Sequence, residues 1–314
     1  MEFTTLGRTN LRASVIGLGG GGPSRLGRSA KISDEESIRV VRRALELGIN
    51  TIDTAESYGT EEIIGAAIQD VPRESLILAT KKGTWGPGRE RLSEQDLVAG
   101  LEASLRRLRT DYIDVYQLHA VLPEVYPEVR DHLIPLLTKL RDQGKIRFLG
   151  ITEMFHADSS HQMLEQAVRD DCWDTIMVGF NLLNQSARRV VFPAAREKNI
   201  GTLIMFAVRR ALSRPERLRE VLAELAADEL IDPALAEQDA TLDFLIHKAG
   251  AVSVPDAAYR YCRHEPGANV ILSGTGNAQH LEANAASLCR PELPAADRAR
   301  LAEMFARVDN VSGS

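Results

Sequence analysis

NTIDTAESYG, residues 50–59, joins an apolar run to a polar segment in which Asp53 and Tyr58 lie five residues apart. The apolar residues predict the end of a short buried strand, and the polar residues predict a loop at its tip. Both side chains are then expected to face the same opening. A phenol donates a proton near neutral pH when a neighbouring ammonium stabilises its ionised form. We therefore expect a buried lysine close to Tyr58.

Two further apolar runs supply candidates for this site. LILATKKG, residues 76–83, carries Lys81 near its end, and VYQLH, residues 115–119, ends in His119. Taken singly, each residue has a structural interpretation, because a lone Lys or His is usually solvated and an Asp after a strand often caps a helix. Taken together, they predict an active site at the C-terminal ends of successive strands.

Strand and helix patterns alternate along the chain. The expected strands cover residues 15–18, 50–53, 76–80, 114–118, 146–151, 175–179, 202–206 and 269–272. The expected helices cover residues 33–48, 61–69, 93–108, 127–143, 161–169, 187–198, 234–248, 259–264, 279–287 and 295–308. The pattern predicts an α/β fold, a closed (β/α)8 TIM barrel, since the dinucleotide fingerprint of the rival open doubly wound sheet is missing.

The two ends of the chain predict additions to this barrel. Residues 1–15 have the pattern of a β-hairpin, with turn residues at 8–10, and such a hairpin can close one end of a barrel. The helix expected over 295–308 is predicted to pack across the outside. Because the sequence contains no linker or low-complexity segment, residues 1–314 are predicted to form a single domain.

Composition excludes several classes of function. A net charge of -6 argues against a general affinity for nucleic acid or for anionic membranes, and it favours a small-molecule substrate. The cysteines, Cys172, Cys262 and Cys289, lack the spacing of metal ligands, so reduced packing thiols and no metal site are predicted. With no signal-like segment and no apolar run long enough to span a bilayer, a cytoplasmic location is expected.

Four phrases of the sequence resemble the aldo-keto reductase family in residue type, order and spacing. They are GINTIDTAESYG (48–59), LILATKKG (76–83), LEASLRRLRTDYIDVYQLHAV (101–121) and QGKIRFLGITE (143–153). The resemblance covers nearly the whole chain and weakens between about 208 and 251. It implies an NAD(P)-dependent oxidoreductase that interconverts an aldehyde, ketone or sugar and the corresponding alcohol by hydride transfer.

The resemblance also implies a role for each candidate catalytic residue. Tyr58 is expected to be the general acid, activated by the neighbouring Lys81, and Asp53 is expected to hold that lysine in place. His119 is expected to donate a hydrogen bond to the carbonyl oxygen. Adjacent side chains on a strand point to opposite faces, so either Lys81 or Lys82 can face Tyr58, and the family register selects Lys81.

Cofactor contacts are expected around the same rim of the barrel. By resemblance, the nicotinamide contacts fall at Thr152, Glu153, Met177 and Phe206, and the phosphate and adenine contacts fall at Gly274, Thr275, Gly276, Asn277, His280 and Asn284. A glycine run that includes Gly20 is expected to let backbone approach the cofactor closely. Arg209 and Arg210 are candidates for the pyrophosphate, with surface arginines as the alternative.

Several of these residues, Met177 and Phe206 among them, depart from the family pattern, and three departures bear on the choice of cofactor. Glu153 replaces an amide, while Gly274 and His280 replace the Lys and Arg of many members that prefer NADP. A neutral imidazole is a poor substitute for a guanidinium, so the sequence leans towards NAD. If Glu153 stays ionised beside the nicotinamide, it favours the oxidised cofactor and oxidation of an alcohol; alternatively, an arginine neutralises it or it turns outward.

The substrate pocket and two alternative functions complete the expectations. Trp85, Val121 and Tyr126 are predicted to line the pocket, on loops that vary freely on one scaffold. One alternative is a regulatory module that binds nucleotide on the same barrel with little turnover. The other is a barrel aldolase with Lys81 as a Schiff base, which would not require Tyr58 and His119 at these positions.

Overall fold

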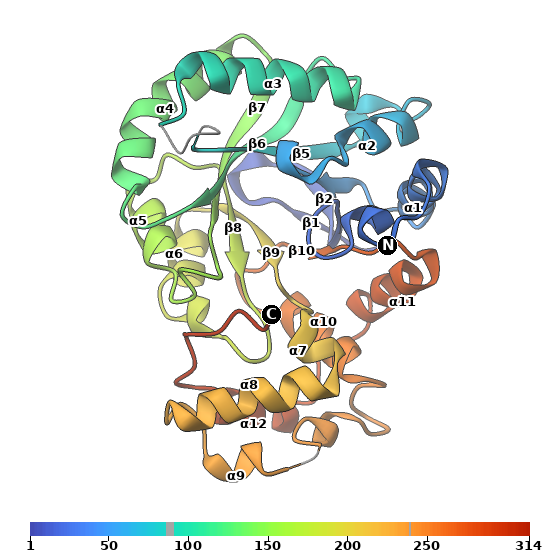
Figure 1. Ribbon diagram of the computed structural model, residues 1–314, viewed down its shortest axis with the longest axis vertical. Coiled ribbons are helices and arrows are strands. Elements are labelled where there is room, and N and C mark those ends of the chain that lie inside the picture. The colour runs from blue at the N-terminus through green and yellow to red at the C-terminus, as the bar shows by residue number, and fades with distance from the viewer. Residues whose placement is uncertain (86–90, 239) are drawn as a thin grey trace.

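In the described residues, eight parallel strands form a closed barrel in the order β10-β3-β4-β5-β6-β7-β8-β9 (Figure 1). The structure is a computed structural model, which describes residues 1–85, 91–238 and 240–314. The strands are β3 (Ile16–Gly19), β4 (Thr51–Asp53), β5 (Ile77–Gly83), β6 (Ile113–Val121), β7 (Ile146–Glu153), β8 (Thr175–Gly179), β9 (Gly201–Met205) and β10 (Val270–Ser273). The predicted (β/α)8 barrel is confirmed.

Helices cover the outside of the barrel. The helices that follow the strands are α1 (Asp34–Glu46), α2 (Glu61–Ala67), α3 (Glu94–Leu108), α4 (Tyr126–Asp142), α5 (Gln162–Asp170), α6 (Val191–Glu197), α10 (Val254–Arg263) and α11 (Ala278–Leu288). The sequence determines their ends locally. In α1, for example, Ser33 accepts a hydrogen bond from the backbone N–H of Glu36, whose carboxylate accepts one from the Ser33 N–H in return.

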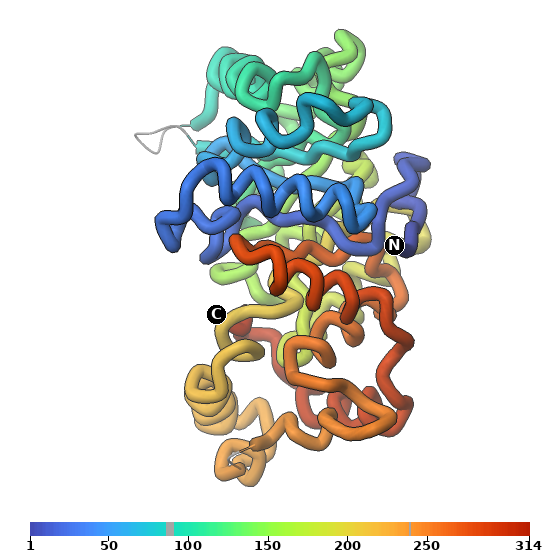
Figure 2. Tube along the Cα trace, turned by 90° about the vertical axis from the view of Figure 1, so that its right-hand side faces the viewer, coloured from blue at the N-terminus to red at the C-terminus, as the bar shows by residue number. Residues whose placement is uncertain are grey.

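An antiparallel hairpin closes the N-terminal end of the barrel. Its strands are β1 (Phe3–Thr5) and β2 (Arg12–Ser14), and Leu6 packs fully buried with the side chains that fill the barrel interior. Gly7 has a φ of +49°, and a Cβ there would lie 2.2 Å from the backbone N of Gly201 at the start of β9. The hairpin therefore fits against the first residues of the strands. Figure 2 shows that it lies at the opposite end of the barrel from the C-terminus.

The segment between β9 and α10 differs from the prediction. A helix that the sequence analysis missed, α8 (Pro215–Ala227), begins with a proline and buries Val221, Leu222 and Leu225. The expected helix over 234–248 is wrong. Within its described part the chain forms α9 (Pro233–Ala236) and a single 3-10 turn at 243–245. The Thr241 hydroxyl donates to the Leu235 carbonyl at 2.8 Å.

Two further helices complete the fold. The short α7 (Arg210–Ser213) precedes α8, and α12 (Ala295–Met304) is the predicted C-terminal helix. Figure 1 shows that α8, α9 and α12 together form a lobe beside the barrel. All three cysteines are free thiols. In the part of the chain that the structure describes, no helix is long and apolar enough to span a membrane.

Candidate active site

Asp53 and Lys81 form a buried ion pair at the C-terminal ends of neighbouring strands. Asp53 is the last residue of β4, and Lys81 lies in β5. The Lys81 Nζ donates to Asp53 Oδ2 at 2.6 Å and to the Thr54 carbonyl oxygen at 2.7 Å. The Lys81 side chain is 0% exposed, so its ammonium is held in one place by these acceptors.

Tyr58 and His119 meet beside this ion pair. The Tyr58 hydroxyl lies 3.2 Å from His119 Nε2, and the two rings are in edge-to-face contact. The Lys81 Nζ is 5.1 Å from the centroid of the Tyr58 ring. Tyr58 belongs to a 3-10 turn, Glu56–Tyr58, that follows β4, and His119 lies near the end of β6. Residues from three segments of the sequence, at 53–58, 81 and 119, are thus brought together at one opening.

Burial decides the charge state of two of these residues. Desolvation raises the pKa of Asp53, although Lys81 and a hydrogen bond from Gln117 act in the opposite direction. Burial and the charge of Lys81 lower the pKa of His119 to about 3. His119 is therefore a neutral imidazole near pH 7, which carries one N–H and one acceptor nitrogen.

Lys82 points away from this cluster. Its Nζ donates to Glu56 Oε2 at 2.5 Å. Its Cε would lie 3.0 Å from a Cβ built on Gly100 in α3, so the side chain lies against the helical layer. The alternation of side chains along β5 thus puts Lys81 inside the barrel and Lys82 outside it.

A cavity of about 140 Å³ opens at Tyr58 and continues along the rim of the barrel. Its lining comes from the ends of β3, β4, β8, β9 and β10, and includes Gly19, Gly21, Gly22, Pro23, Asp53, Tyr58, Met177, Met205, Phe206, Ala207, Val208, Arg209, Tyr259, Leu272 and Gly274. A Cβ on Gly21 would lie 2.3 Å from the Tyr58 ring, so this position has no room for a side chain. The glycine loop therefore packs directly on the aromatic ring.

Some of the predicted cofactor residues line this cavity, and the others lie outside its lining. Met177, Phe206, Arg209 and Gly274 line it. The Arg209 guanidinium lies 4.2 Å from the centroid of the Phe206 ring, and its Nε donates to Ser314 Oγ at 3.0 Å. Arg210, by contrast, is exposed at the start of α7.

Gly20 and Thr152 hold backbone and do not line the cavity. The Gly20 N–H donates to the Asp53 carbonyl oxygen at 2.7 Å, and the Gly20 carbonyl accepts from the Thr60 hydroxyl. The Thr152 hydroxyl accepts from the Ala120 N–H at 2.7 Å, which fixes the turn after His119. Gly20 therefore contacts the backbone of Asp53, and Thr152 contacts the backbone next to His119.

The prediction for Glu153 requires a correction, because its carboxylate is not isolated beside the cavity. Its carboxylate faces His161 Nδ1 at 2.9 Å and accepts from the Gly179 N–H at 2.7 Å. Both side chains are fully buried. Burial raises the pKa of Glu153, and His161 opposes that effect. The side chain that contacts the carboxylate is therefore His161, and not an arginine, the alternative considered from the sequence.

The loop before α11 is organised by its own side chains. Asn277 Oδ1 accepts from the backbone N–H groups of Gln279 and His280, at 2.8 and 3.1 Å, and so caps the helix. Thr275 Oγ1 accepts from the Asn277 N–H, and Asn284 Nδ2 donates to Ser273 Oγ. The backbone N–H groups of Gln279 and His280, at the start of α11, are thus already bound within the chain. Gly276 packs against Gly27, where a Cβ would lie 2.3 Å from the Gly27 Cα.

None of the three residues expected at the substrate pocket is among the residues that line this cavity. Tyr126 packs in the helical layer, where its hydroxyl donates to Asp170 at 2.8 Å and accepts from Trp173. Trp85 is 48% exposed and borders a separate hollow with Lys82. Val121 is fully buried at the end of β6, opposite Glu153 in the register with β7.

The structure also identifies residues near the site that sequence reasoning missed. Gln117 donates to Asp53 Oδ1 at 3.1 Å from two positions before His119. The segment 312–314 lies over the cavity rim, where the Ser312 carbonyl accepts from Asn181 Nδ2 and Ser312 Oγ lies 3.0 Å from His156 Nδ1. Position 117 could have been found from its inward register with His119. The contacts of 312–314 have no signal in the local sequence.

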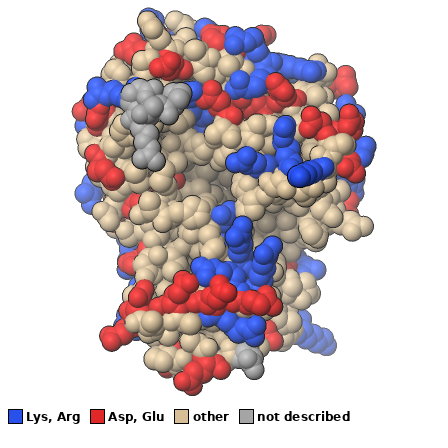
Figure 3. Space-filling view, viewed as in Figure 1, with Lys and Arg blue, Asp and Glu red and all other residues tan. Residues whose placement is uncertain are grey.

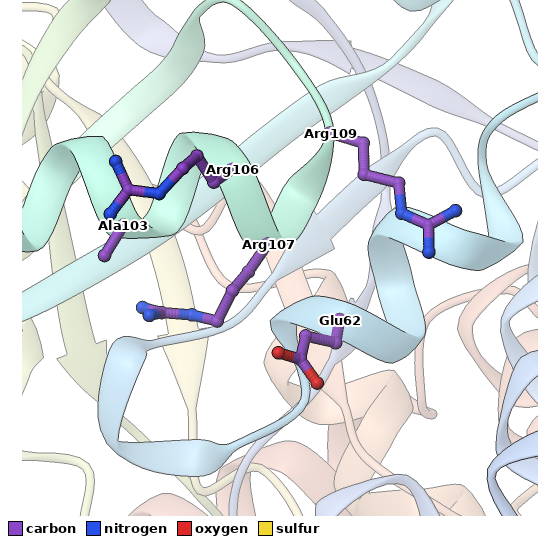
Figure 4. Close-up of a pocket in the computed structure, with 5 residues that line it drawn as sticks. All are labelled: Glu62, Ala103, Arg106, Arg107 and Arg109. Carbon is purple, nitrogen blue, oxygen red and sulfur yellow. The ribbon is translucent and has the colours of Figure 1, made fainter.

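Charge is unevenly distributed around these features. In Figure 3, Lys and Arg side chains gather beside the hollowed centre of the face, and acidic side chains form a band on the lobe below it. A separate hollow of about 450 Å³ lies between α2 and α3 and is lined by Glu62, Ala103, Arg106, Arg107 and Arg109 (Figure 4). Arg107 there pairs with the buried Glu61, so this hollow belongs to the packing of the two helices.

Comparisons with known proteins agree on the family of the chain. The chain is 32% identical to "Aldo-keto reductase YhdN" of Bacillus subtilis over 90% of this chain and 87% of that protein. It is 26% identical to "L-galactose dehydrogenase" of Arabidopsis thaliana, over 99% and 95% of the two chains. The holo form of aldo-keto reductase AKR11C1 from Bacillus halodurans has the same fold, with a TM-score of 0.73 and 22% identity over 97% and 96% of the chains.

The sequence model of the "Aldo/keto reductase family" matches residues 15–305, from the first barrel strand to the end of the last helix. The match includes the barrel, the cavity and the cluster of Asp53, Tyr58, Lys81 and His119. With nearly the whole chain matched and the relatives oxidoreductases by name, this protein is an oxidoreductase of the aldo/keto reductase family.

Proposed function

We propose that this protein is an NAD(P)-dependent oxidoreductase that interconverts a carbonyl compound and its alcohol by hydride transfer, with Tyr58 as the proton donor and acceptor. The observation that carries the proposal is the contact between the Tyr58 hydroxyl and His119 Nε2, 3.2 Å long, beside a buried ammonium. A neutral hydrogen-bonding imidazole and a buried cation are what a phenol needs for this role.

The cavity has features that suit a nicotinamide dinucleotide. Backbone without side chains runs along it at Gly21, Gly22 and Gly274, and a Cβ on Gly274 would lie 3.0 Å from the Gly19 carbonyl oxygen. Phe206 offers a flat ring in the lining of the same cavity. When bound, a reduced nicotinamide supplies hydride to the carbonyl carbon. Phe206, Met177, Gly274 and Arg209 are the residues that would hold it.

The side chains of the cluster have separate roles in reduction. The Tyr58 hydroxyl gives its proton to the carbonyl oxygen, and the Lys81 ammonium stabilises the phenolate that remains. Asp53 keeps the ammonium in place through its 2.6 Å ion pair. The neutral His119 orients the oxygen with its single N–H. In oxidation, the same groups work in reverse, and Tyr58 accepts the proton of the alcohol.

The proposed cofactor is NAD in preference to NADP. His280 and Gly274 stand where many NADP-preferring members have an arginine and a lysine, and both positions are exposed. One relative, 29% identical over 64% of this chain, is named "NADH-specific methylglyoxal reductase" in Escherichia coli. Small aldehydes and ketones of that kind form the first substrate class to test, followed by sugars and their alcohols.

Replacement of Tyr58 by Phe tests the proposal. We expect kcat on an established substrate to fall by ~10²- to 10⁴-fold while the nucleotide dissociation constant changes little. Steady-state kinetics and nucleotide-induced fluorescence changes measure the two quantities. Tyr112→Phe is the control, because the Tyr112 ring packs under Arg73 away from the cavity. Full turnover by Tyr58→Phe would disprove the assignment. Nucleotide binding without turnover on any carbonyl or alcohol would instead favour a regulatory module.

A further inference from the structure

We propose that Gln117 is a positioning residue for this site: its amide holds the carboxylate of Asp53 in the orientation and charge state that fix Lys81 beside Tyr58. The inference rests on the proposed function and adds a residue that acts through Asp53. Gln117 is fully buried in β6 and lies opposite Lys81 in the register with β5.

The two oxygens of Asp53 are held by different donors. Gln117 Nε2 donates to Oδ1 at 3.1 Å, and Lys81 Nζ donates to Oδ2 at 2.6 Å. An ionised carboxylate only accepts hydrogen bonds, so the amide must present its NH2 and not its oxygen. Lys81 is the charged group that faces Asp53, and Tyr58 and His119 lie beyond it. A donor on each oxygen prevents the carboxylate from rotating away from the lysine.

The neighbouring strand leaves room for this amide. A Cβ on Gly150, in the facing position of β7, would lie 2.7 Å from Gln117 Cγ. Any side chain at position 150 would therefore displace the glutamine. This close approach requires glycine at position 150. Gly150 is the first residue of the GITE segment, so this segment leaves space for the glutamine that orients Asp53.

Stability alone does not explain a glutamine at this position. Gln117 Oε1 is buried and has no hydrogen-bond partner among the described residues, which is a cost in free energy. Gln185 shows the contrasting, purely structural arrangement. Its Nε2 donates to the carbonyls of Leu182 and Leu301, and its Oε1 accepts from Arg188. The amide of Gln117 is thus directed by a single partner, the site carboxylate.

The expected consequence is a change in pH dependence. Without the donor from Gln117, the ionised form of Asp53 loses a hydrogen bond and takes up a proton at higher pH. A protonated Asp53 no longer balances the charge of Lys81, so turnover should fall. The acidic limb of the plot of kcat/KM against pH is therefore expected to move to higher pH by about one unit in Gln117→Met. Hydrogen bonds to charged groups are stronger than those between neutral groups.

Gln117→Met and Gln185→Met form a matched pair, because each removes one buried amide and keeps the side chain's size. We expect the acidic limb to shift in the first and to stay in place in the second, although both variants can change the melting temperature. An unshifted limb in Gln117→Met would overturn the proposal. If that variant does not fold, Gln117→Glu replaces it: a second carboxylate beside Asp53 should also move the limb upward, and an unmoved limb again overturns the proposal.

A measurement that needs no turnover separates this inference from the proposed function. The melting temperatures of Gln117→Met and wild type are compared between pH 4 and pH 8. The lost hydrogen bond matters while Asp53 is ionised, so the difference should grow as pH rises, whereas that of Gln185→Met should stay constant. A constant difference for Gln117→Met would count against the positioning role. Failure of the proposed function would appear separately, as wild type without turnover.

Discussion

Lys81 and His119 show how burial sets the chemistry of single residues in this barrel. Lys81 is a buried ammonium whose charge is balanced by Asp53 at 2.6 Å. His119, close to that ammonium, is kept neutral. Removal of one partner from a buried ion pair is costly, because it leaves an uncompensated charge in a medium of low dielectric constant. The cluster therefore behaves as a unit, and single substitutions are expected to affect more than the residue that is changed.

Substitution of the two adjacent lysines distinguishes the inside of the barrel from its outside. Lys81→Met should abolish most turnover, because it removes the cation that stabilises the ionised form of Tyr58. Lys82→Met should leave kcat within a few fold, since Lys82 pairs with Glu56 against the helical layer. Comparing kcat and the melting temperature of both variants makes the test. Equal losses of turnover in two folded variants would contradict the assignment of Lys81.

The protonation of His119 gives a prediction about stability and pH. In the unfolded chain a histidine titrates near pH ~6.5, whereas burial and Lys81 lower the pKa of His119 in the folded protein to about 3. Between these values the unfolded state binds more protons, so the folded state loses stability as pH falls, by up to ~1.4 kcal/mol per pH unit. His119→Asn should flatten this dependence.

Urea denaturation of wild type and His119→Asn between pH 4 and pH 7 provides the measurement. His280→Asn is the control, because His280 is exposed on α11. A nitrogen-15 titration of the histidine rings gives an independent check, in which the His119 signals should stay those of a neutral ring above pH ~4. Protonation of His119 near pH 6 would contradict both the predicted burial effect and its role as a neutral donor.

At the scale of elements, Glu153 joins three parts of the barrel. Its carboxylate at the end of β7 binds His161, which precedes α5, and the backbone of Gly179 at the end of β8. His161 in turn stacks on Phe155, whose ring meets Phe206 in edge-to-face contact. Glu153, which replaces the family's amide, is thus connected to the cavity-lining Phe206 through His161 and Phe155.

Glu153→Leu should therefore destabilise the fold more than it alters cofactor preference. Removing one partner of a buried pair costs ~3–5 kcal/mol, and the Gly179 N–H also loses its acceptor. Glu153→Gln keeps an acceptor and should cost less. The free energy of unfolding in urea measures the effect, with the exposed Glu303→Gln as control. A large change in the ratio of NAD⁺ to NADH affinity in a stable Glu153→Gln protein would restore the sequence-based view of an ionised carboxylate beside the cofactor.

The elements themselves could be predicted to different degrees. The eight barrel strands were predicted because each is a short apolar run between polar segments. The helix α8 was missed although Pro215, Leu218, Leu222 and Leu225 have helix-start and helical spacing. The helix over 234–248 was wrong: within its described part the structure has α9, which ends at Ala236, and a 3-10 turn at 243–245. Errors therefore concentrate in the lobe, where contacts outside the repeating pattern decide the structure.

At the scale of the whole molecule, an overall negative charge coexists with basic residues beside the cavity (Figure 3). Long-range attraction of an anionic cofactor therefore depends on this local distribution and not on the net charge. Local cations are also expected to decide between NAD and NADP, since the two differ by one phosphate.

His280→Arg tests the proposed preference by gain of affinity. A guanidinium at this exposed position can make charge-assisted hydrogen bonds to the 2′-phosphate, so we expect the NADPH dissociation constant to fall by roughly tenfold while that of NADH stays constant. Fluorescence titration of both nucleotides measures this. Gln279→Arg is the matched control, because it adds the same charge at the neighbouring exposed position. A wild-type protein that already binds NADPH more tightly than NADH would contradict the preference.

The sequence by itself determined the barrel and the identities of the four cluster residues. The period of its apolar runs dictates eight strands, and the strand ends of a parallel barrel meet at one rim wherever the loops lead. Asp53, His119 and one of the two adjacent lysines were therefore predicted as a group, and the resemblance to the family selected Lys81. Tyr58 followed because its loop is short and begins at a strand tip.

Tertiary structure alone decided which side chains support them and which residues reach the cavity. Glu153 pairs with His161, Gln117 crosses to Asp53, and residues 312–314 lie over the rim. The inward register of Gln117 with His119 is periodic, but it does not name the partner of the amide. Each of these contacts depends on distances between strands or chain ends that form when the barrel closes, and buried polar atoms then take whichever partner lies within hydrogen-bonding distance.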